Sequence, residues 1–209
     1  MSADKPQYPR DYPKLFIPGP TAVHPYVLQA MATPMIGHRE KEFVDVYNRI
    51  QPRLQKLIGT KQPVFLASNS ASGTMEGAVR NLSKKKVLAC VCGAFSGKWA
   101  DISESNGKPT TRLTVDWGQP ITPEAVDAEL TKNPSVYDLV ICVFNETSCG
   151  MRNPIPEIAK VVRKHEGVLF AVDAVSNLAG EKIDTDAIGI DWLLAGVQKA
   201  FGLPPGLAV

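Results

Sequence analysis

The sequence predicts an α/β fold in which a mostly parallel β-sheet is flanked on both sides by helices. Three observations support this prediction. Short apolar runs alternate with amphipathic segments, the apolar runs are continuous, and polar residues follow directly after several of them. Continuous apolar runs suit parallel strands buried on both faces, and such sheets bind ligands at the carboxyl ends of their strands.

The composition is that of a globular chain large enough for one sizeable domain. Of the 209 residues, 44% are hydrophobic and 21% are charged, and the net charge of +2 does not indicate nucleic-acid binding. The first residues lack the apolar core of a secretory signal, and no apolar run is long enough to span a membrane. Four cysteines without clustered histidines indicate reduced thiols in a cytosolic protein, so no metal site is predicted.

The amino-terminal elements are an arm, a turn and a long helix. Residues 1–15 are rich in proline and polar residues, which predicts an extended arm across a partner subunit or, alternatively, a frayed terminus. Residues 16–20 end in Pro-Gly-Pro, a rigid turn. Apolar residues at helical spacing predict a helix over 40–58, with a kink at Pro52 and an end at Gly59.

A strand at residues 63–67 is expected to lead through small residues into a helix that ends near Leu82. A turn of small residues at a helix start leaves backbone N–H groups free at the positive end of the helix dipole, where a phosphate can bind. A serine N-cap without any ligand is the alternative. The residues between strand and helix, 68–74, are therefore a candidate phosphate site.

The remaining elements continue the alternation. Strands are predicted at 87–92, 110–115, 138–144, 168–173 and 191–195, and helices at 96–107, from 122 onward and from 154 to about 165. The last residues, 206–209, are expected to begin one more core strand.

Two charged residues stand where buried strands end: Asp173 closes one apolar run, and Lys199 follows another in a glycine-flanked loop. An enclosed lysine loses its proton more readily and can then attack a carbonyl. This pair suits pyridoxal phosphate (PLP), because the lysine holds the cofactor aldehyde and the aspartate keeps the pyridine nitrogen protonated. A surface lysine and an N-capping aspartate are the alternatives.

Six motifs together resemble those of the class V aminotransferases, in the branch of alanine–glyoxylate and serine–pyruvate aminotransferases. They are Phe-Ile-Pro-Gly-Pro-Thr (16–21), Gly-His-Arg (37–39), Ser-Gly-Thr-Met-Glu-Gly-Ala (72–78), Asn-Glu-Thr-Ser-Cys-Gly (145–150), Val-Asp-Ala-Val-Ser (172–176) and Gln-Lys-Ala (198–200). The resemblance implies a three-layer α/β/α large domain of the fold type I PLP enzymes over residues 16–209. It also implies that the chain stops before a C-terminal small domain.

The resemblance also implies a role for individual residues. Lys199 would form the internal aldimine with PLP, and Asp173 would pair with the pyridine nitrogen. Phe95 and Val175 would sandwich the cofactor ring. The implied phosphate ligands are Ala71, Ser72 and Gln198, Ser148 would reach the cofactor near its 3-oxygen, and the implied substrate-pocket residues are Gly19 and His38.

Several of these positions have a plain structural alternative. Phe95, where many relatives have tryptophan, can be an ordinary core residue. His38 and Arg39 can be an exposed pair before a helix, and the turn at Gly19 can be purely structural. Cys149 stands where many relatives have threonine, and a thiol is a poorer hydrogen-bond donor, so a polar role there is in doubt.

The resemblance implies a homodimeric transaminase that moves an amino group from alanine or serine to glyoxylate or pyruvate, and the cysteines indicate that it is cytoplasmic. The alternatives are another PLP reaction, such as that of a lyase or a cysteine desulfurase, and a truncated domain that binds PLP or partners without turnover. No cysteine follows Lys199, which disfavours a desulfurase. The family binds the substrate carboxylate with an arginine, and none of Arg39, Arg112 and Arg152 matches its position. Little transaminase activity is therefore expected of the 209-residue chain alone.

Overall fold

The computed structural model describes residues 7–8 and 12–209, and the arm predicted for residues 1–15 lies mostly outside this part. The helices are α1 (Pro25–Met31), α2 (Lys41–Ile58), α3 (Ala71–Leu82), α4 (Ala94–Ser105), α5 (Pro123–Lys132), α6 (Ile155–Val162) and α7 (Thr185–Ile188). The strands are β1 (Val87–Val91), β2 (Thr110–Thr114), β3 (Leu139–Val143), β4 (Asn145–Glu146), β5 (Met151–Arg152), β6 (Leu169–Asp173) and β7 (Trp192–Leu194).

Five strands form one sheet in the order β2-β1-β3-β6-β7, and all neighbouring pairs are parallel. In this register Val143 at the end of β3 lies beside Asp173 at the end of β6, which in turn lies beside Leu194 at the end of β7. The carboxyl ends of these three strands therefore meet at one edge. The predicted α/β architecture with a parallel sheet is confirmed.

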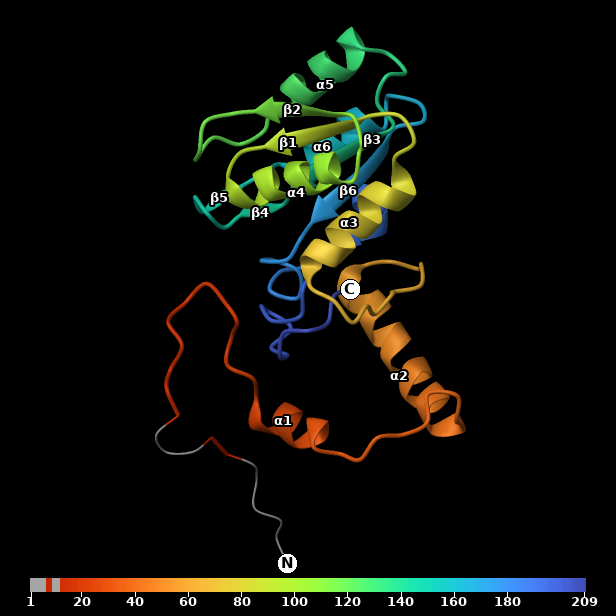
Figure 1. Cartoon of the computed structure of the whole chain (residues 1–209), viewed down its shortest axis with the longest axis vertical. Helices are drawn as coiled ribbons and strands as arrows, with labels where there is room; N and C mark the ends of the chain where they lie inside the picture. The colour runs from red at the N-terminus through yellow and green to blue at the C-terminus, as the bar shows by residue number, and fades with distance from the viewer. Residues whose placement is uncertain (1–6, 9–11) are drawn as a thin grey trace, which may run out of the picture.

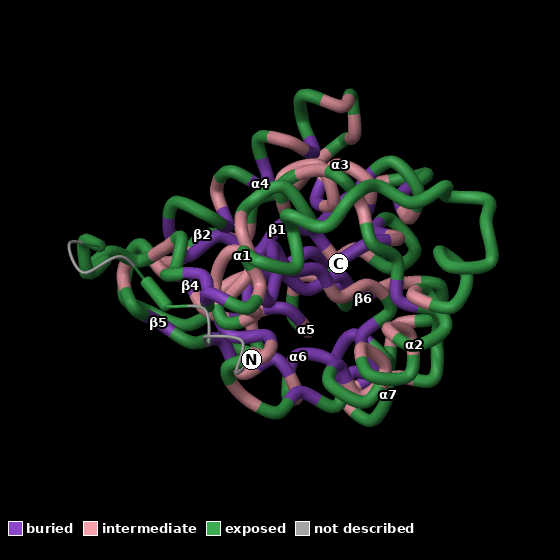
Figure 2. Tube along the Cα trace, turned by 90° about the horizontal axis from the view of Figure 1, so that it is seen from below, coloured by how far each residue is buried: buried purple, intermediate pink, exposed green. Residues whose placement is uncertain are grey.

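The sheet separates two apolar cores, as the alternation of side chains along a buried strand requires. Of the residues of β1, Leu88 and Cys90 belong to the core that α5 and α6 cover. Val87, Ala89 and Val91 belong to the core that α3 and α4 cover, where Trp99 is buried. The strands run through the buried interior of the domain, with helices on either side (Figures 1 and 2).

The segment before α3 extends away from the sheet, with α1 and the start of α2 farthest from it (Figure 1). Helix α2 has the predicted extent and is followed by Gly59, whose φ of 69° lies in the left-handed region, while the kink at Pro52 stays a prediction. The segment exposes large apolar side chains, among them Phe16 and Met35 at 91% and 97% of their surface. In the part of the chain that is described, no helix is both long and apolar enough to cross a membrane.

The prediction of a strand at residues 63–67 is wrong. Within this segment only Ala67 forms a β-bridge, an isolated antiparallel one with Ala208. The side-chain amide of Gln51 takes both backbone groups of Val64, accepting from its N–H at 3.0 Å and donating to its carbonyl at 2.7 Å. Those groups are then not available to a sheet. Ala208 also bridges Gly196, so residues 206–209 begin an antiparallel edge rather than a full strand.

Candidate active site

The candidate site lies at the edge of the sheet where the parallel strands end. Asp173 is the last residue of β6, and Lys199 lies in the turn after β7. Helices α3 and α4 begin near the same edge, α4 directly after β1. Parallel sheets of this kind place ligands at this edge, so the topology gathers residues that are far apart in the sequence (Figure 1).

Asp173 is a buried carboxyl group that lacks a cationic partner. It is 6% exposed, and its Oδ1 accepts a hydrogen bond of 2.8 Å from the N–H of Val175. Burial raises the pKa of Asp173 to about 6, the negative charge of Glu146 adds to the rise, and the Val175 N–H and the charge of Lys199 oppose it. No ion pair found among the described residues includes Asp173. Such a carboxyl group suits a positively charged ring nitrogen.

Lys199 is partly buried and held against the Pro-Gly-Pro turn. Its ammonium donates a hydrogen bond of 2.6 Å to the carbonyl of Pro18. A Cβ placed on Gly19, whose φ is +138°, would lie 2.8 Å from Cδ of Lys199, so only glycine leaves room for the lysine there. Thr21 fixes the same contact, with its N–H donating to Gln198 at 2.9 Å and its hydroxyl to Lys199 at 3.0 Å. The predicted residue Gly19 thus lies beside Lys199.

The start of α3 offers free backbone donors. The residue before it, Ser70, has extended backbone angles and makes no side-chain capping bond. Within the described residues, the N–H groups of Ala71 and Ser72 have no hydrogen-bond acceptor, whereas that of Gly73 donates to the carbonyl of Ser70. Two N–H groups at the positive end of a twelve-residue helix suit a phosphate, and phosphate binding by Ala71 and Ser72 stays a prediction.

The start of α4 is occupied by protein groups. The N–H groups of Phe95 and Ser96 donate to the carboxylate of Glu146 at 3.2 and 2.9 Å, and that of Ala94 donates to the hydroxyl of Ser148 at 3.0 Å. The Ser148 hydroxyl in turn donates to Glu146 at 2.6 Å. Of these two helix starts at the site, only α3 is therefore open to an anion. The Phe95 side chain is 43% exposed and is not an ordinary core residue.

The remaining predicted residues differ in how closely they join this group. Val175 binds Asp173 through its N–H and packs partly buried beside the α3–α4 core. The side chain of Gln198 lies over Gly196, where an added Cβ would come within 2.4 Å of its Oε1. His38 is exposed in a turn before α2, whose start lies away from the sheet, so this chain alone does not bring it to the site.

Sequence reasoning missed Glu146. It is fully buried and follows the apolar strand β3, within the motif that drew attention to Ser148. A glutamate directly after a buried strand is an unusual choice, because a buried carboxylate must be paired or hydrogen-bonded. That signal was present in the sequence, but three of the five donors to the carboxylate belong to Phe95 and Ser96 of α4, some fifty residues earlier.

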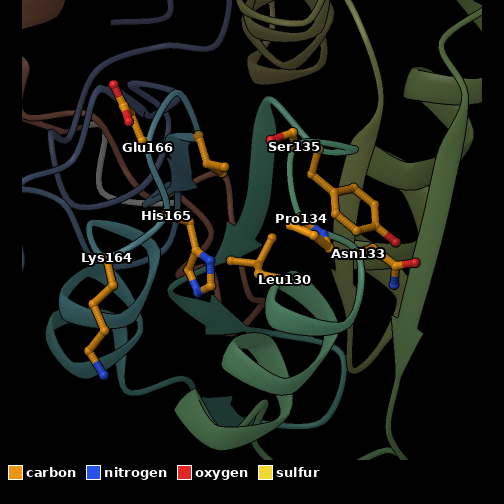
Figure 3. A pocket seen from close by; sticks show the side chains of 9 residues that line it. Leu130, Asn133, Pro134, Ser135, Lys164, His165 and Glu166 are labelled. Atoms are coloured by element: carbon orange, nitrogen blue, oxygen red, sulfur yellow. The ribbon is translucent and has the colours of Figure 1, made fainter.

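A pocket of about 200 Å³ lies at the opposite edge of the sheet (Figure 3). Its lining comes from α5 and from the loops that precede β3 and β6. It comprises Leu130, Asn133, Pro134, Ser135, Tyr137, Lys164, His165, Glu166 and Val168. None of these residues belongs to the predicted site. The pocket is therefore separate from the strand ends that carry Asp173 and Lys199.

Comparison with known proteins identifies the family of this chain. The sequence model of the family "Aminotransferase class-V" matches residues 20–209. An uncharacterized aminotransferase of Methanocaldococcus jannaschii is 41% identical over 93% of this chain and 50% of its own length. A serine–glyoxylate aminotransferase of Methylorubrum extorquens is 32% identical, again over 93% of this chain and 50% of its own.

A solved structure shows the same fold. The alanine–glyoxylate aminotransferase of a Nostoc species superposes with a TM-score of 0.87 and 29% identity, covering 97% of this chain and 54% of that one. This chain spans about half the length of the curated relatives it matches.

Proposed function

This chain belongs to the class V aminotransferase family, and from that premise we propose that it forms the PLP-binding large domain of a transaminase. The proposed domain comprises residues 16–209, with residues 1–15 as an amino-terminal arm. The observation that carries the proposal is the arrangement at one sheet edge. It combines a buried carboxyl group without a cation, a lysine after the neighbouring strand and a helix start with free N–H groups.

Each residue has a proposed task in this site. When bound, PLP supplies an electron sink for the electron pair at the substrate α-carbon. Lys199 would hold the cofactor aldehyde through Nζ, and its amine, when free, would accept the proton from the substrate α-carbon. Asp173, in its anionic form, keeps the pyridine nitrogen protonated.

The other proposed contacts position the cofactor and the substrate. Ala71, Ser72 and Gln198 bind the phosphate, and Phe95 and Val175 pack on the two faces of the ring. Ser148 lies near the 3-oxygen of the ring, where its hydroxyl already joins Glu146 to the start of α4. Gly19 and His38 are proposed to line the substrate pocket, of which only Gly19 adjoins Lys199 in this chain.

The proposed reaction moves the amino group of a small amino acid, alanine or serine, to a 2-oxo acid such as glyoxylate or pyruvate. Two similar proteins support this choice, since their names pair serine or alanine with glyoxylate. We also propose a cytoplasmic homodimer. The cytoplasmic location is supported by four free cysteine thiols, and the dimer by the exposed apolar side chains of the segment before α3.

The direct test is reductive trapping of the cofactor. The 209-residue chain is incubated with PLP, reduced with borohydride and mapped by mass spectrometry. The expected result is one PLP-modified peptide, which contains Lys199. Modification of other lysines with none at Lys199, or no PLP binding at all, would overturn the proposal. Transfer of the amino group from alanine or serine to glyoxylate is then measured separately on the same preparation.

A further inference from the structure

Glu146 is the least exposed acidic residue of the described part of the chain, with none of its surface accessible to solvent. Its carboxylate has no cationic partner among the described ion pairs and instead accepts five hydrogen bonds. Oε1 accepts from the N–H of Phe95 (3.2 Å) and from the N–H and hydroxyl of Ser148 (3.3 and 2.6 Å). Oε2 accepts from the N–H and hydroxyl of Ser96 (2.9 and 2.8 Å).

These hydrogen bonds keep Glu146 ionised. Burial raises the pKa of a carboxyl group, but the hydrogen bonds from Ser148, Ser96 and Phe95 outweigh that effect, so the pKa of Glu146 is lowered. The positive end of the α4 dipole acts in the same direction. Glu146 therefore serves as a fixed negative charge that binds the first turn of α4.

The backbone around Glu146 is shaped to allow this contact. A Cβ on Gly93 would lie 2.4 Å from Cγ of Glu146 and 2.6 Å from Oγ of Ser148, so a glycine is required for the two segments to approach. The Ser96 hydroxyl accepts from the N–H of Gly93 at 3.0 Å while it donates to Glu146. The start of α4 is thus joined to the β4 segment through the Glu146 carboxylate, beside the bond from the Ala94 N–H to the Ser148 hydroxyl.

We propose that Glu146 is a positioning residue that holds Phe95 in place for the cofactor ring without touching the cofactor itself. The inference depends on the proposed function, because it assumes that Phe95 packs against PLP. Glu146 binds the N–H of Phe95 itself and that of the next residue, so it fixes the backbone from which the aromatic side chain projects. The 43% exposure of that side chain leaves the ring available to a ligand.

The informative substitution is Glu146→Gln, which preserves the shape but removes the charge. Each oxygen of the Glu146 carboxylate accepts from two or more donors. In the glutamine variant one of these positions holds an NH₂ group, which cannot accept, so it meets N–H or O–H donors in either orientation of the side-chain amide. The first turn of α4 must then shift. Glu104→Gln is the matched control, since it alters the far end of the same helix, where Glu104 binds Arg112 at the surface.

The first measurement needs no cofactor. Hydrogen–deuterium exchange of the peptide covering residues 94–99 is compared in the unaltered protein and both variants. Glu146→Gln is expected to increase exchange at the amides of Phe95 and Ser96, and Glu104→Gln is expected to leave them unchanged. Unaltered protection of these amides in a folded Glu146→Gln protein would overturn the inference.

The second measurement is a double-mutant cycle on PLP affinity. Loss of a charge-assisted hydrogen bond weakens PLP binding by about tenfold if Glu146 acts on the site. When Phe95→Ala has already removed the ring, Glu146→Gln is expected to weaken binding only about twofold, because coupled residues are not additive. An equal effect in both backgrounds would show that Glu146 does not act through Phe95.

A further variant covers the case in which Glu146→Gln does not fold. Ser96→Ala removes one hydroxyl donor and keeps the carboxylate, and its smaller effect on PLP affinity should likewise shrink in the Phe95→Ala background. If it does not, the inference fails. Failure of the unaltered protein to bind PLP would overturn the proposed function together with this inference, whereas normal binding with an additive cycle overturns this inference alone.

Discussion

Asp173→Asn should stabilise the PLP-free protein while it weakens the cofactor site. The pKa of Asp173 is raised from 3.8 to about 6 in the folded protein, because burial disfavours the charged form. The folded state therefore binds the proton more tightly than the unfolded state does. Stability is lost as the pH rises from the unfolded pKa through the folded one, and the loss is complete above the folded pKa.

The size of the effect follows from the shift of the pKa. A change from 3.8 to about 6 corresponds to a cost of about 3 kcal/mol at pH 7.5 and roughly half of that at pH 5. Asparagine has nearly the same shape and no charge, so the variant avoids this cost at every pH. The stability gained by Asp173→Asn should therefore grow by about 1.4 kcal/mol between pH 5 and pH 7.5.

Urea unfolding of the PLP-free protein at both pH values provides the assay. Asp116→Asn is the control, because it makes the same change at an exposed position and should alter stability by less than about 0.5 kcal/mol. A variant that is less stable than the unaltered protein at pH 7.5, or a gain that does not grow with pH, would refute the reasoning. PLP affinity, measured in parallel, should fall, since the pyridine nitrogen loses its anionic partner.

Three other predictions concern the lysine, the glycine at the start of α4 and the activity of the chain. Lys199→Ala should abolish borohydride-dependent labelling while weak, reversible PLP binding remains, and labelling that persists at one other lysine would show that Lys199 has been misassigned. Gly93→Ala places a Cβ 2.4 Å from Cγ of Glu146 and should lower the free energy of unfolding by about 1–3 kcal/mol. An unchanged midpoint of thermal unfolding would contradict the predicted loss of stability. Assayed alone with alanine or serine and glyoxylate, the chain should turn over far more slowly than about 1 per second. One reason is that Arg112 and Arg152 are engaged by Asp101, Glu104 and Glu181, and a rate at or above that value would contradict the expectation.

Local chemistry was sufficient to predict most elements of the sheet. The continuous apolar runs at β1, β3 and β6 can only be buried on both faces, and the glycine after α2 ends that helix in a left-handed conformation. The place of Asp173 could be predicted for the same reason, because a charged residue that closes a buried run must lie at the sheet edge, whichever strand lies beside it. Lys199 lies farther along, in the turn after β7.

Prediction from the sequence failed where a backbone group is hydrogen-bonded to a side chain from another part of the chain. Residues 63–67 have the composition of a strand, but Gln51 binds both backbone groups of Val64 and removes them from the sheet. No property of residues 63–67 indicates this contact. The short elements α1, β4, β5 and α7 were also not predicted, because each has too few residues to show a repeating pattern of apolar side chains.

What the sequence alone determined was the fold class, most of its strands and a set of candidate residues for PLP binding, because these depend on side-chain chemistry and local spacing. Only the tertiary structure decided the order of the strands and the difference between the two helix starts. At α3 the N–H groups of Ala71 and Ser72 remain free, whereas at α4 Glu146 and Ser148 occupy them. That difference arises from a carboxylate fifty residues along the chain, and its donors on α4 are known only once β1 and β3 lie side by side.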